Sequence, residues 1–412
     1  MKYGLIGEKL RHSFSKVIHE RLADYEYELC CIKPEELDNF MRNRDFTAIN
    51  VTIPYKEAVI PYLYYISPEA ERIGAVNTIV NKDGRLYGYN TDIHGMTELA
   101  RHAGISLEGK KVAVLGTGGT SKAAVECATR LDALGIVKVS RRASDEAITY
   151  GELYSDYSDV EVIINTTPVG MYPNGGEAAI DVSRLPMLEG VIDAVYNPMR
   201  PRLVCDAMER GITAEGGLYM LVAQAVKAAE IFLDTEYPEG VTDKIFEDLA
   251  RKKENIILVG MPSCGKSTVG KRIAEELGRQ FVDTDDIIRR AEGCEIPEIF
   301  EKHGETFFRE CEMKAVRCAS IESGLVIATG GGAVLRRENV EAMRENGRIY
   351  FIDRPIDLLV PTSDRPLSQN REAIEQRFKE RYPIYTACAD VRIDGGGSVS
   401  EVAESIIKEF CK

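Results

Sequence analysis

One glycine-rich loop constrains the fold of this chain more than any other feature of its sequence. The run Gly260-Met-Pro-Ser-Cys-Gly265-Lys266-Ser267 fits the pattern G-x-x-x-x-G-K-[ST], between the apolar stretch 256–259 and a helical pattern. In such a loop the backbone N–H groups surround phosphate oxygens, the lysine adds a positive charge, and the serine hydroxyl ligates Mg²⁺. The sequence therefore predicts a strand, a nucleotide-phosphate loop and a helix here. The expected contacts are Gly260, Cys264, Gly265, Lys266, Ser267 and Thr268.

A different glycine-rich turn lies in the first half of the chain. Gly116-Thr-Gly118-Gly119 follows the strand pattern 112–115 and precedes the helical run 121–130, as a dinucleotide-binding fold requires. The next strand ends in Ser140-Arg141-Arg142, where an NAD-binding protein usually places an acidic residue. Two guanidiniums suit a 2′-phosphate, so the pattern favours NADP(H) over NAD. The alternative is that both arginines are only a solvated strand end.

The chain is too long for one hydrophobic core, since its 412 residues exceed the usual domain size. Short apolar runs alternate with helical patterns in both halves, which predicts an α/β fold with parallel sheets flanked by helices. The expected strands are 112–115, 137–139, 162–164, 191–192, 256–259, 280–282, 325–328, 349–352 and 391–393. We place the domain boundary at 253/254, within or just after a polar stretch that begins at Tyr237.

The composition argues against several classes of protein. A net charge of −14 disfavours nucleic-acid binding, and no apolar run approaches the roughly 20 residues that cross a bilayer. The first residues form a strand pattern without the apolar core of a signal peptide. Ten scattered cysteines without a C-x-x-C pair fit reduced thiols. We expect a cytoplasmic enzyme that acts on small molecules without binding nucleic acid or membrane. The sequence leaves a homodimer open.

Several short motifs follow one another along the first half of the chain. They are His12-Ser13-Phe-Ser15, Asn50-Val-Thr52-Ile-Pro-Tyr-Lys56, Gly74-Ala-Val-Asn77-Thr, Gly88-Tyr-Asn90-Thr-Asp92, Asn165-Thr-Thr-Pro-Val-Gly170, Tyr196-Asn-Pro198 and Gly217-Leu-Tyr-Met220-Leu-Val-Ala-Gln224-Ala. In order and spacing this set resembles shikimate dehydrogenase, over about residues 2–233. The resemblance implies a substrate domain, about 1–95 plus 218–253, and an NADP-binding Rossmann domain, about 96–217.

The chemistry of ketone reduction explains why such a site needs these residue types. Negative charge develops on the carbonyl oxygen, so a proton donor and an electrostatic partner must lie beside it, and Lys56 and Asp92 supply that pair. The resemblance implies that Ser13 and Ser15 bind the substrate carboxylate. The other implied substrate contacts are Thr52, Asn77, Asp92, Tyr196 and Gln224. The expected cofactor contacts are Gly116, Gly118, Gly119, Thr120, Ser140, Arg141, Arg142, Thr166 and Gly217. The plainer alternative makes Lys56 a surface lysine and Asp92 a helix N-cap.

Further motifs follow the phosphate loop in the second half. The apolar run 280–282 ends in Asp283-Thr-Asp285. Residues two apart on an extended chain face the same way, so both carboxylates are expected beside the loop. The later motifs are Gly304-Glu-Thr-Phe-Phe-Arg309, Thr329-Gly330-Gly331-Gly332, Asp364-Arg365-Pro-Leu and Arg381-Tyr-Pro-Ile-Tyr385. The set resembles shikimate kinase, from about Asn255 to the C-terminus.

This second resemblance implies a role for each motif. Asp283 would join Ser267 in holding Mg²⁺, and Asp285 would orient the accepting hydroxyl. The implied substrate contacts are Arg309 and Arg381, which clamp the carboxylate, and Gly331 and Gly332, while Arg365 reaches the phosphoryl group from a lid. As alternatives, the three glycines are a flexible loop and Arg309 is an ordinary surface arginine. The lid lacks an arginine that commonly stacks on adenine, so we expect weak ATP binding.

The two halves together predict a bifunctional enzyme. One half reduces 3-dehydroshikimate with NADPH, and the other phosphorylates the product, shikimate, at its 3-hydroxyl with MgATP. Two alternatives are kept. In one, the first half acts on quinate; in the other, the second half is an ATP-sensing, weakly active kinase module.

Overall fold

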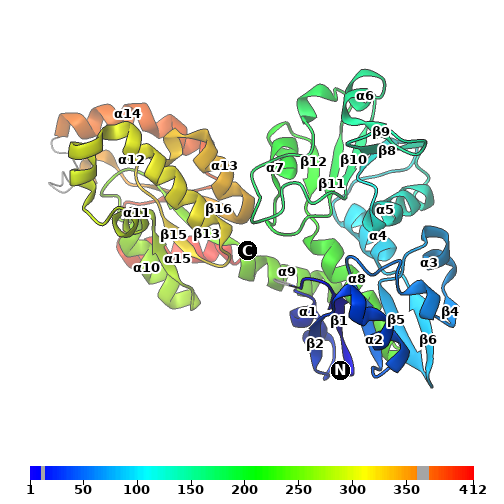
Figure 1. Cartoon of the computed structure of the whole chain (residues 1–412). Coiled ribbons are helices and arrows are strands. Elements are labelled where there is room, and N and C mark those ends of the chain that lie inside the picture. Colours follow the sequence, from blue (N-terminus) through cyan, green and yellow to red (C-terminus); the bar gives the residue numbers. More distant parts are fainter. Residues whose placement is uncertain (11–13, 360–370) are drawn as a thin grey trace. The chain divides into compact units, whose positions relative to one another are not determined.

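The computed structural model of the chain describes residues 1–10, 14–359 and 371–412. It divides into two compact units (Figure 1). Unit 1 comprises Met1–Met171, Glu177–Asn197 and Leu203–Asp248. Unit 2 comprises Tyr172–Gly176, Pro198–Arg202 and Leu249–Lys412. Each unit has its own sheets and its own hydrophobic core, and each is described by itself below.

Unit 1 begins with a mixed sheet whose strand order is β2-β1-β3-β5-β6-β4. Its strands are β1 (Tyr3–Gly7), β2 (Tyr27–Cys31), β3 (Ala48–Val51), β4 (Tyr65–Ile66), β5 (Thr78–Lys82) and β6 (Arg85–Tyr89). Strands β1, β2 and β3 run parallel, whereas β5 pairs antiparallel with β3 and β6. Its helices are α1 (Ser15–Leu22), α2 (Leu37–Asn43) and α3 (Pro68–Ile73). Strand β3 ends at Val51, so the motif from Thr52 to Lys56 begins at the carboxyl end of this strand.

The second sheet of unit 1 is entirely parallel, with strand order β12-β11-β10-β7-β8-β9. Its strands are β7 (Lys111–Leu115), β8 (Gly135–Ser140), β9 (Ile148–Thr149), β10 (Val162–Asn165), β11 (Gly190–Asp193) and β12 (Thr213–Glu215). Its helices are α5 (Gly119–Arg130), α6 (Tyr150–Ser155) and α7 (Arg202–Glu209). In sequence this order is 3-2-1-4-5-6, the doubly wound arrangement that binds dinucleotides at the carboxyl edge of the strands.

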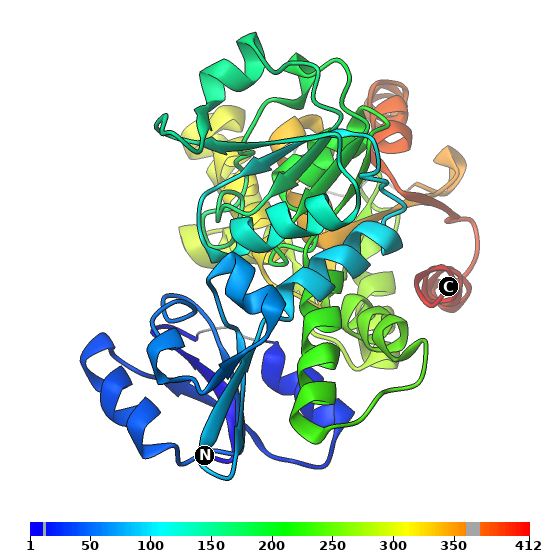
Figure 2. The same cartoon turned by 90° about the vertical axis from the view of Figure 1, so that its right-hand side faces the viewer.

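Two helices connect the two sheets of unit 1. They are α4 (Asp92–His102) and α8 (Leu218–Leu233), and α9 (Val241–Lys253) follows them. Figure 2 shows α8, in green, beside the blue first sheet, although it follows the second sheet in sequence. The two helices pack closely because Gly95 has no side chain: a Cβ there would lie 2.7 Å from the carbonyl oxygen of Met220. This close packing brings the start of α4 and the middle of α8 to one site.

Unit 2 is built on one parallel sheet with strand order β14-β15-β13-β16-β17. The strands are β13 (Asn255–Val259), β14 (Phe281–Asp283), β15 (Val326–Ala328), β16 (Gly347–Asp353) and β17 (Val391–Asp394). The helices are α10 (Lys266–Leu277), α11 (Thr284–Glu292), α12 (Ile296–Ile321), α13 (Arg337–Asn346), α14 (Arg371–Cys388) and α15 (Val399–Phe410). Strand β13 lies at the centre and is buried along its whole length, so the phosphate loop begins at the middle of the sheet edge.

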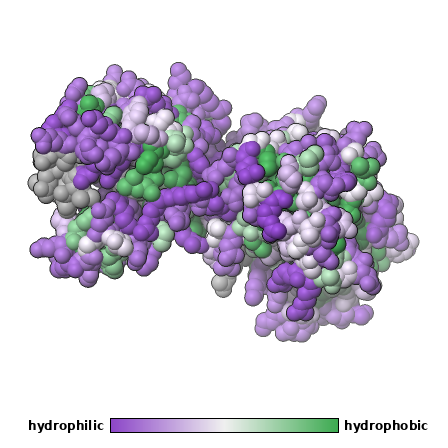
Figure 3. Space-filling model, turned by 90° about the horizontal axis from the view of Figure 1, so that it is seen from above, coloured by the Kyte–Doolittle hydropathy of each residue, from purple (hydrophilic) through white to green (hydrophobic). Residues whose placement is uncertain are grey.

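The predicted fold class is confirmed, and each strand expected from the sequence is present. The boundaries differ by one or two residues; β16, for example, begins at Gly347 rather than at residue 349. Hydrophilic residues cover most of the visible face in Figure 3, with hydrophobic ones scattered among them. No helix among the described residues is both long enough and apolar enough to span a membrane.

Candidate functional sites

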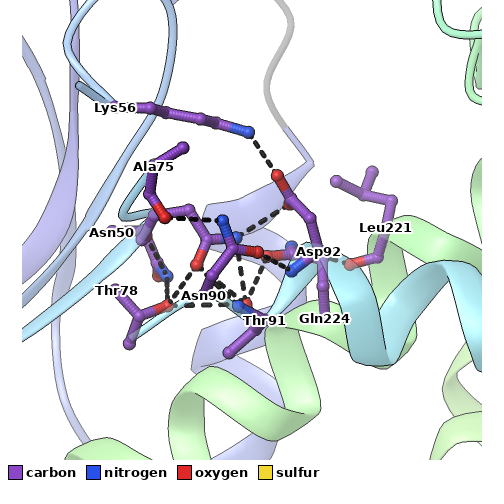
Figure 4. Close-up of polar contacts among 10 residues, drawn as sticks. Asn50, Lys56, Ala75, Thr78, Asn90, Thr91, Asp92, Leu221 and Gln224 are labelled. Carbon is purple, nitrogen blue, oxygen red and sulfur yellow. Dashed lines mark hydrogen bonds and ion pairs between the residues drawn. The ribbon is translucent and has the colours of Figure 1, made fainter. Parts of the chain in front are cut away.

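An ion pair joins Lys56 and Asp92 in unit 1. The Lys56 Nζ donates to Asp92 Oδ2 at 2.5 Å, and only 14% and 8% of the two side chains are exposed (Figure 4). Lys56 follows β3, whereas Asp92 is the first residue of α4, so the fold joins residues that are far apart in sequence. Asp92 is not the N-cap of its helix, because that position belongs to Thr91. The alternative, in which Lys56 is a surface lysine and Asp92 is a helix N-cap, is therefore disfavoured.

A buried network of amides and hydroxyls fixes the Asp92 carboxylate. Asn77 Nδ2 donates to Asp92 Oδ1 at 2.8 Å. The Asp92 backbone N–H donates to Asn90 Oδ1 at 3.0 Å (Figure 4). Asn77 Oδ1 in turn accepts from the backbone N–H of Thr91 at 2.8 Å. Asn50 Nδ2 extends the network by donating to Thr78 Oγ1 at 3.2 Å. Because each of these groups is hydrogen-bonded, the network holds the Asp92 carboxylate in one orientation. Apart from the Lys56 ammonium, the groups named here are uncharged.

A cavity of about 250 Å³ opens beside this ion pair. Its polar lining comes from Lys9, Ser15, Asn50, Thr52, Lys56, Asn77, Asp92, Thr120, Tyr196 and Gln224. Gln224 is oriented by its own helix, since Nε2 donates to the Leu221 carbonyl at 2.9 Å. Burial raises the pKa of the Tyr196 hydroxyl, which is therefore a neutral hydrogen-bonding group at ordinary pH. A cavity rimmed by hydroxyls and amides fits a small polyhydroxylated ligand.

The glycine turn of unit 1 follows the carboxyl end of β7. Gly116 has φ of +108°, and a Cβ there would lie 2.8 Å from Thr166 Oγ1. A Cβ on Gly118 would meet nothing within 4 Å, and Gly118 is the N-cap of α5 without a side-chain cap. The first N–H groups of α5 are therefore accessible to an anion, and the residues fit a dinucleotide pyrophosphate. A Cβ on Gly119 would lie 3.6 Å from Lys56 Cδ, so the cofactor turn and the ion pair share one cleft.

Two arginines follow the next strand. Arg141 and Arg142 are exposed, and neither has an ion-pair partner among the described residues. Ser140, at the end of β8, hydrogen-bonds through its hydroxyl to the backbone of Arg142. Gly217 is also a predicted cofactor contact. No side chain fits there, because a Cβ would overlap the carbonyl oxygen of Ala194. Unpaired guanidiniums at this strand end fit a phosphate-bearing cofactor.

The phosphate loop of unit 2 wraps around Lys266. Gly260 and Gly265 have φ of +148° and +97°, which favours glycine at both positions. The Lys266 ammonium donates to the carbonyl oxygens of Gly260 and Met261, both at 2.9 Å, and lies 3.7 Å from Cys264 Sγ. Gly265 caps α10 without a side chain, so the N–H groups of the first turn, at Ser267 and Thr268, face the loop. The loop presents a cation and a helix N-terminus to a phosphate.

The two aspartates at the end of β14 do not both lie on an extended chain, as the sequence had led us to expect. Asp283 ends the strand and caps α11, whereas Asp285 already lies in the first turn of that helix. The reasoning from an extended chain was therefore wrong, because the cap turns the backbone between the two residues. Ser267 Oγ donates to Asp283 Oδ2 at 2.6 Å, so the two predicted metal ligands do lie together. One hydroxyl and one carboxylate fit Mg²⁺, which usually takes few protein ligands plus water and phosphate oxygens.

The loop of three glycines is closely packed rather than flexible. A Cβ on Gly330 would lie 3.0 Å from Asp285 Oδ1, and one on Gly331 would lie 2.8 Å from Pro262 of the phosphate loop. A Cβ on Gly332 would overlap the guanidinium of Arg309. Arg381 donates to the Gly331 carbonyl at 3.0 Å. The glycines thus let Asp285, the phosphate loop and both arginines converge around one backbone segment.

Arg309 is a buried arginine with two acidic partners. Its NH1 donates to Glu312 Oε2 at 2.7 Å, and its NH2 donates to Glu305 Oε1 at 3.0 Å. Glu312 is 1% exposed, and burial together with the neighbouring Asp285 raises its pKa, although Arg309 opposes this shift. Arg381 is also buried, at 7% exposure. The alternative of an ordinary surface arginine is disfavoured for Arg309, because the residue is buried, at 9% exposure.

Two predicted site residues, Ser13 and Arg365, and the lid around Arg365 lie outside the described residues. Sequence reasoning missed several residues that line or support the sites, among them three polar residues. Lys9 and Asn50 line the cavity of unit 1, and Glu312 supports Arg309. Asn50 could have been found, because it opens the motif that ends at Lys56. Glu312 had a weaker signal, its spacing of three residues from Arg309 on a helix.

Together the two sites define a dinucleotide-dependent oxidoreductase joined to a P-loop phosphotransferase. Comparison with known proteins supports both of these classes. The family model "Shikimate dehydrogenase substrate binding domain" matches residues 5–79, and the model "Shikimate kinase" matches residues 262–411. The NADP⁺-dependent shikimate dehydrogenase of Clostridium perfringens is 37% identical in an alignment of 265 positions, and the match covers 60% of this chain and 97% of that protein. This chain therefore belongs to the shikimate dehydrogenase family, and its C-terminal part is a shikimate kinase domain.

Solved structures give the same result for the first part of the chain. Shikimate dehydrogenase 1 from Peptoclostridium difficile is 38% identical, with a TM-score of 0.56, over 60% of this chain and 98% of that one. A chorismate mutase/shikimate 5-dehydrogenase fusion from Clostridium acetobutylicum is 35% identical, with a TM-score of 0.58, over 61% and 97%. Quinate dehydrogenase from Corynebacterium glutamicum shares the fold at 24% identity, with a TM-score of 0.54 over 60% and 98%.

Proposed function

We propose that this chain catalyses two reactions on one small acid. Unit 1 reduces 3-dehydroshikimate to shikimate with NADPH, and unit 2 phosphorylates shikimate at its 3-hydroxyl with MgATP. The observation that carries the proposal is the presence of a dehydrogenase and a kinase of the same compound in one chain, so that the product of the first is the substrate of the second. We assign the dehydrogenase to residues 1–253, with a substrate domain of about 1–95 plus 218–253 and an NADP domain of about 96–217. The kinase is assigned to residues 254–412.

In the proposed reduction, Lys56 acts on the ketone oxygen. NADPH, when bound at the glycine turn, supplies the hydride. The Lys56 ammonium donates a proton to the oxygen as negative charge develops there, and Asp92, paired with it at 2.5 Å, keeps the ammonium in place. The polar side chains of Ser13, Ser15, Thr52, Asn77, Tyr196 and Gln224 bind the carboxylate and hydroxyls of the ring. Gly116, Gly118, Gly119, Thr120, Ser140, Arg141, Arg142, Thr166 and Gly217 are assigned to the cofactor.

In the proposed phosphorylation, positioning and charge neutralisation do most of the work. MgATP, when bound, supplies the phosphoryl group. Asp285 orients the 3-hydroxyl and accepts its proton, while Lys266 leaves its loop carbonyls to neutralise phosphate oxygens. Ser267 and Asp283 hold the metal, and Arg309 and Arg381 hold the substrate carboxylate. The phosphate-loop contacts are Gly260, Cys264, Gly265 and Thr268, the ring contacts are Gly331 and Gly332, and Arg365 contacts the phosphoryl group.

A coupled assay tests both reactions on the purified chain. With 3-dehydroshikimate, NADPH and MgATP present, we expect NADPH oxidation, followed by ADP release that depends on the first reaction. ADP release with shikimate alone checks the second reaction separately. Absence of either activity would contradict the corresponding half of the proposal.

Two alternatives remain as outcomes of this test. If quinate turned over faster than shikimate with NADP⁺, the substrate assignment of unit 1 would be wrong. If ADP release did not depend on shikimate, unit 2 would be an ATP-sensing module instead. Neither alternative is favoured, because the family models and the close relatives are those of shikimate enzymes. Weak ATP binding, a cytoplasmic location and a homodimer stay predictions.

A further inference from the structure

The charges around the cavity of unit 1 leave one cation without a partner. Three charged side chains line this cavity among the described residues: Lys9, Lys56 and Asp92. Lys56 and Asp92 neutralise one another at 2.5 Å. Lys9 has no ion-pair partner among the described residues, and it is exposed. The described lining therefore carries a net charge of about +1, and that charge belongs to Lys9.

The backbone around Lys9 is fixed although its side chain is free. β1 ends at Gly7, where a Cβ would lie 2.7 Å from Thr52 Cγ2, so the chain passes directly against the wall of the cavity. The Glu8 N–H donates to the Ile53 carbonyl at 3.4 Å, and the Leu10 side chain is buried at 8% exposure. Lys9 lies between these two anchored residues. Its ammonium can therefore move over the cavity mouth while its Cα stays in place.

An acid bound in this cavity needs such a charge. Ser15, the described residue expected at the carboxylate, offers a neutral hydroxyl, and the Lys56 ammonium is already satisfied by Asp92. The chain as a whole carries a charge of −14 and repels an anion. A free ammonium at the mouth offsets this repulsion locally and pairs with a carboxylate by a charge-assisted hydrogen bond.

We infer that Lys9 is a substrate-positioning residue of the dehydrogenase, and that its ammonium pairs with the carboxylate of the bound acid. The inference rests on the proposed function, since it requires an acidic substrate in this cavity. Lys9 takes no part in hydride or proton transfer, which occurs at the ketone beside Lys56. It selects for a ligand that carries a negative charge.

The test compares Lys9→Met with two matched variants, using 3-dehydroshikimate and NADPH. Because the ammonium is exposed, Lys9→Met should raise KM about fivefold, and kcat should change less than about twofold. Lys9→Arg should keep the KM of the unchanged chain. Lys16→Met removes a lysine from the same segment, but one paired on the surface with Glu20 at 3.1 Å, and it should leave KM unchanged. In about 0.5 M salt the difference between Lys9→Met and the unchanged chain should largely disappear.

The neutral methyl ester of 3-dehydroshikimate separates charge from shape. Lys9→Met should leave the KM of the ester unchanged while raising that of the acid. An equal rise for both would mean that Lys9 only supports the local fold, and no rise for either would mean that it does not meet the carboxylate. Both results overturn the inference while the unchanged chain still turns over the acid. If the unchanged chain did not reduce the acid at all, the proposed function would fail as well.

Discussion

The candidate sites of the two units are built from different kinds of polar group. In unit 1 the buried polar groups are mostly amides and hydroxyls arranged around one ion pair. In unit 2 two buried arginines, Arg309 and Arg381, face the three-glycine loop, and a buried glutamate supports one of them. Reduction moves little charge over the ligand as a whole, whereas phosphoryl transfer brings several negative oxygens together. We infer that the number of buried cations in each site reflects the charge that its proposed reaction brings together.

The largest effect that tests this comparison is expected at Lys266. Lys266→Ala removes the cation of the phosphate loop, which is proposed to neutralise phosphate oxygens, so ADP release should fall by at least about a thousandfold. NADPH oxidation should not change, because Lys266 belongs to unit 2. Lys271→Ala, one turn along α10 on an exposed surface, is the control and should keep both activities. Substantial ADP release from Lys266→Ala would mean that unit 2 does not depend on its loop cation.

The next effect is expected in unit 1, where the proposed reduction depends on a single ammonium. Lys56→Ala should lower kcat for ketone reduction by at least about a hundredfold, because it removes the proposed proton donor and leaves Asp92 without its partner. Shikimate-dependent ADP release should stay the same. Lys111→Ala, which breaks a surface ion pair with Asp159, serves as the control. If both activities fell together, the two sites would not be independent.

A smaller effect is expected from the glutamate that supports Arg309. Glu312→Gln keeps the shape of the side chain but removes the buried charge that pairs with the guanidinium at 2.7 Å. We expect KM for shikimate to rise about tenfold in the kinase assay, since a buried partner matters more than an exposed one. Glu305→Gln is the matched control: Glu305 contacts the same arginine at 3.0 Å but is 55% exposed, so its effect should stay below about twofold. Equal effects would show that burial does not distinguish the two glutamates.

Much of the fold, and much of the site, could be predicted from the sequence. Strand patterns and glycine turns identify the parallel sheets, because an apolar run that ends in a glycine turn has few other structures available. Lys56 and Asp92 could be paired through motifs that are specific as a set. Asp285 was placed on an extended chain because sequence spacing does not reveal that Asp283 caps a helix. Lys9 and Glu312 were missed because their roles depend on tertiary neighbours: a cavity for Lys9 and a buried guanidinium for Glu312.

The smallest effect concerns a buried acid that, unlike Glu312, has no cation beside it in the described parts of the chain. Asp193 ends β11 of unit 1; its Oδ1 accepts from Asn165 and from the Val195 N–H, and its Oδ2 has no partner among the described residues. Burial raises the pKa of this carboxyl to about 7, although both hydrogen bonds oppose the shift. The folded chain therefore holds a proton that the unfolded chain releases near pH 4. The stability that this group contributes is lost as the pH rises toward 7.

We therefore expect Asp193→Asn to reduce the pH dependence of the stability of unit 1. Between about pH 5.5 and pH 8 the free energy of unfolding should fall less in the variant than in the unchanged chain, by an amount on the order of 2 kcal/mol. Urea denaturation followed by circular dichroism measures this change, and the transition that NADP⁺ shifts to higher urea identifies unit 1. Asp156→Asn, at the exposed end of α6, is the control. An unchanged pH dependence in Asp193→Asn would mean that this acid is ionised in the folded chain. Unit 1 would then tolerate a buried charge without a cation, and the contrast between the two units would no longer hold.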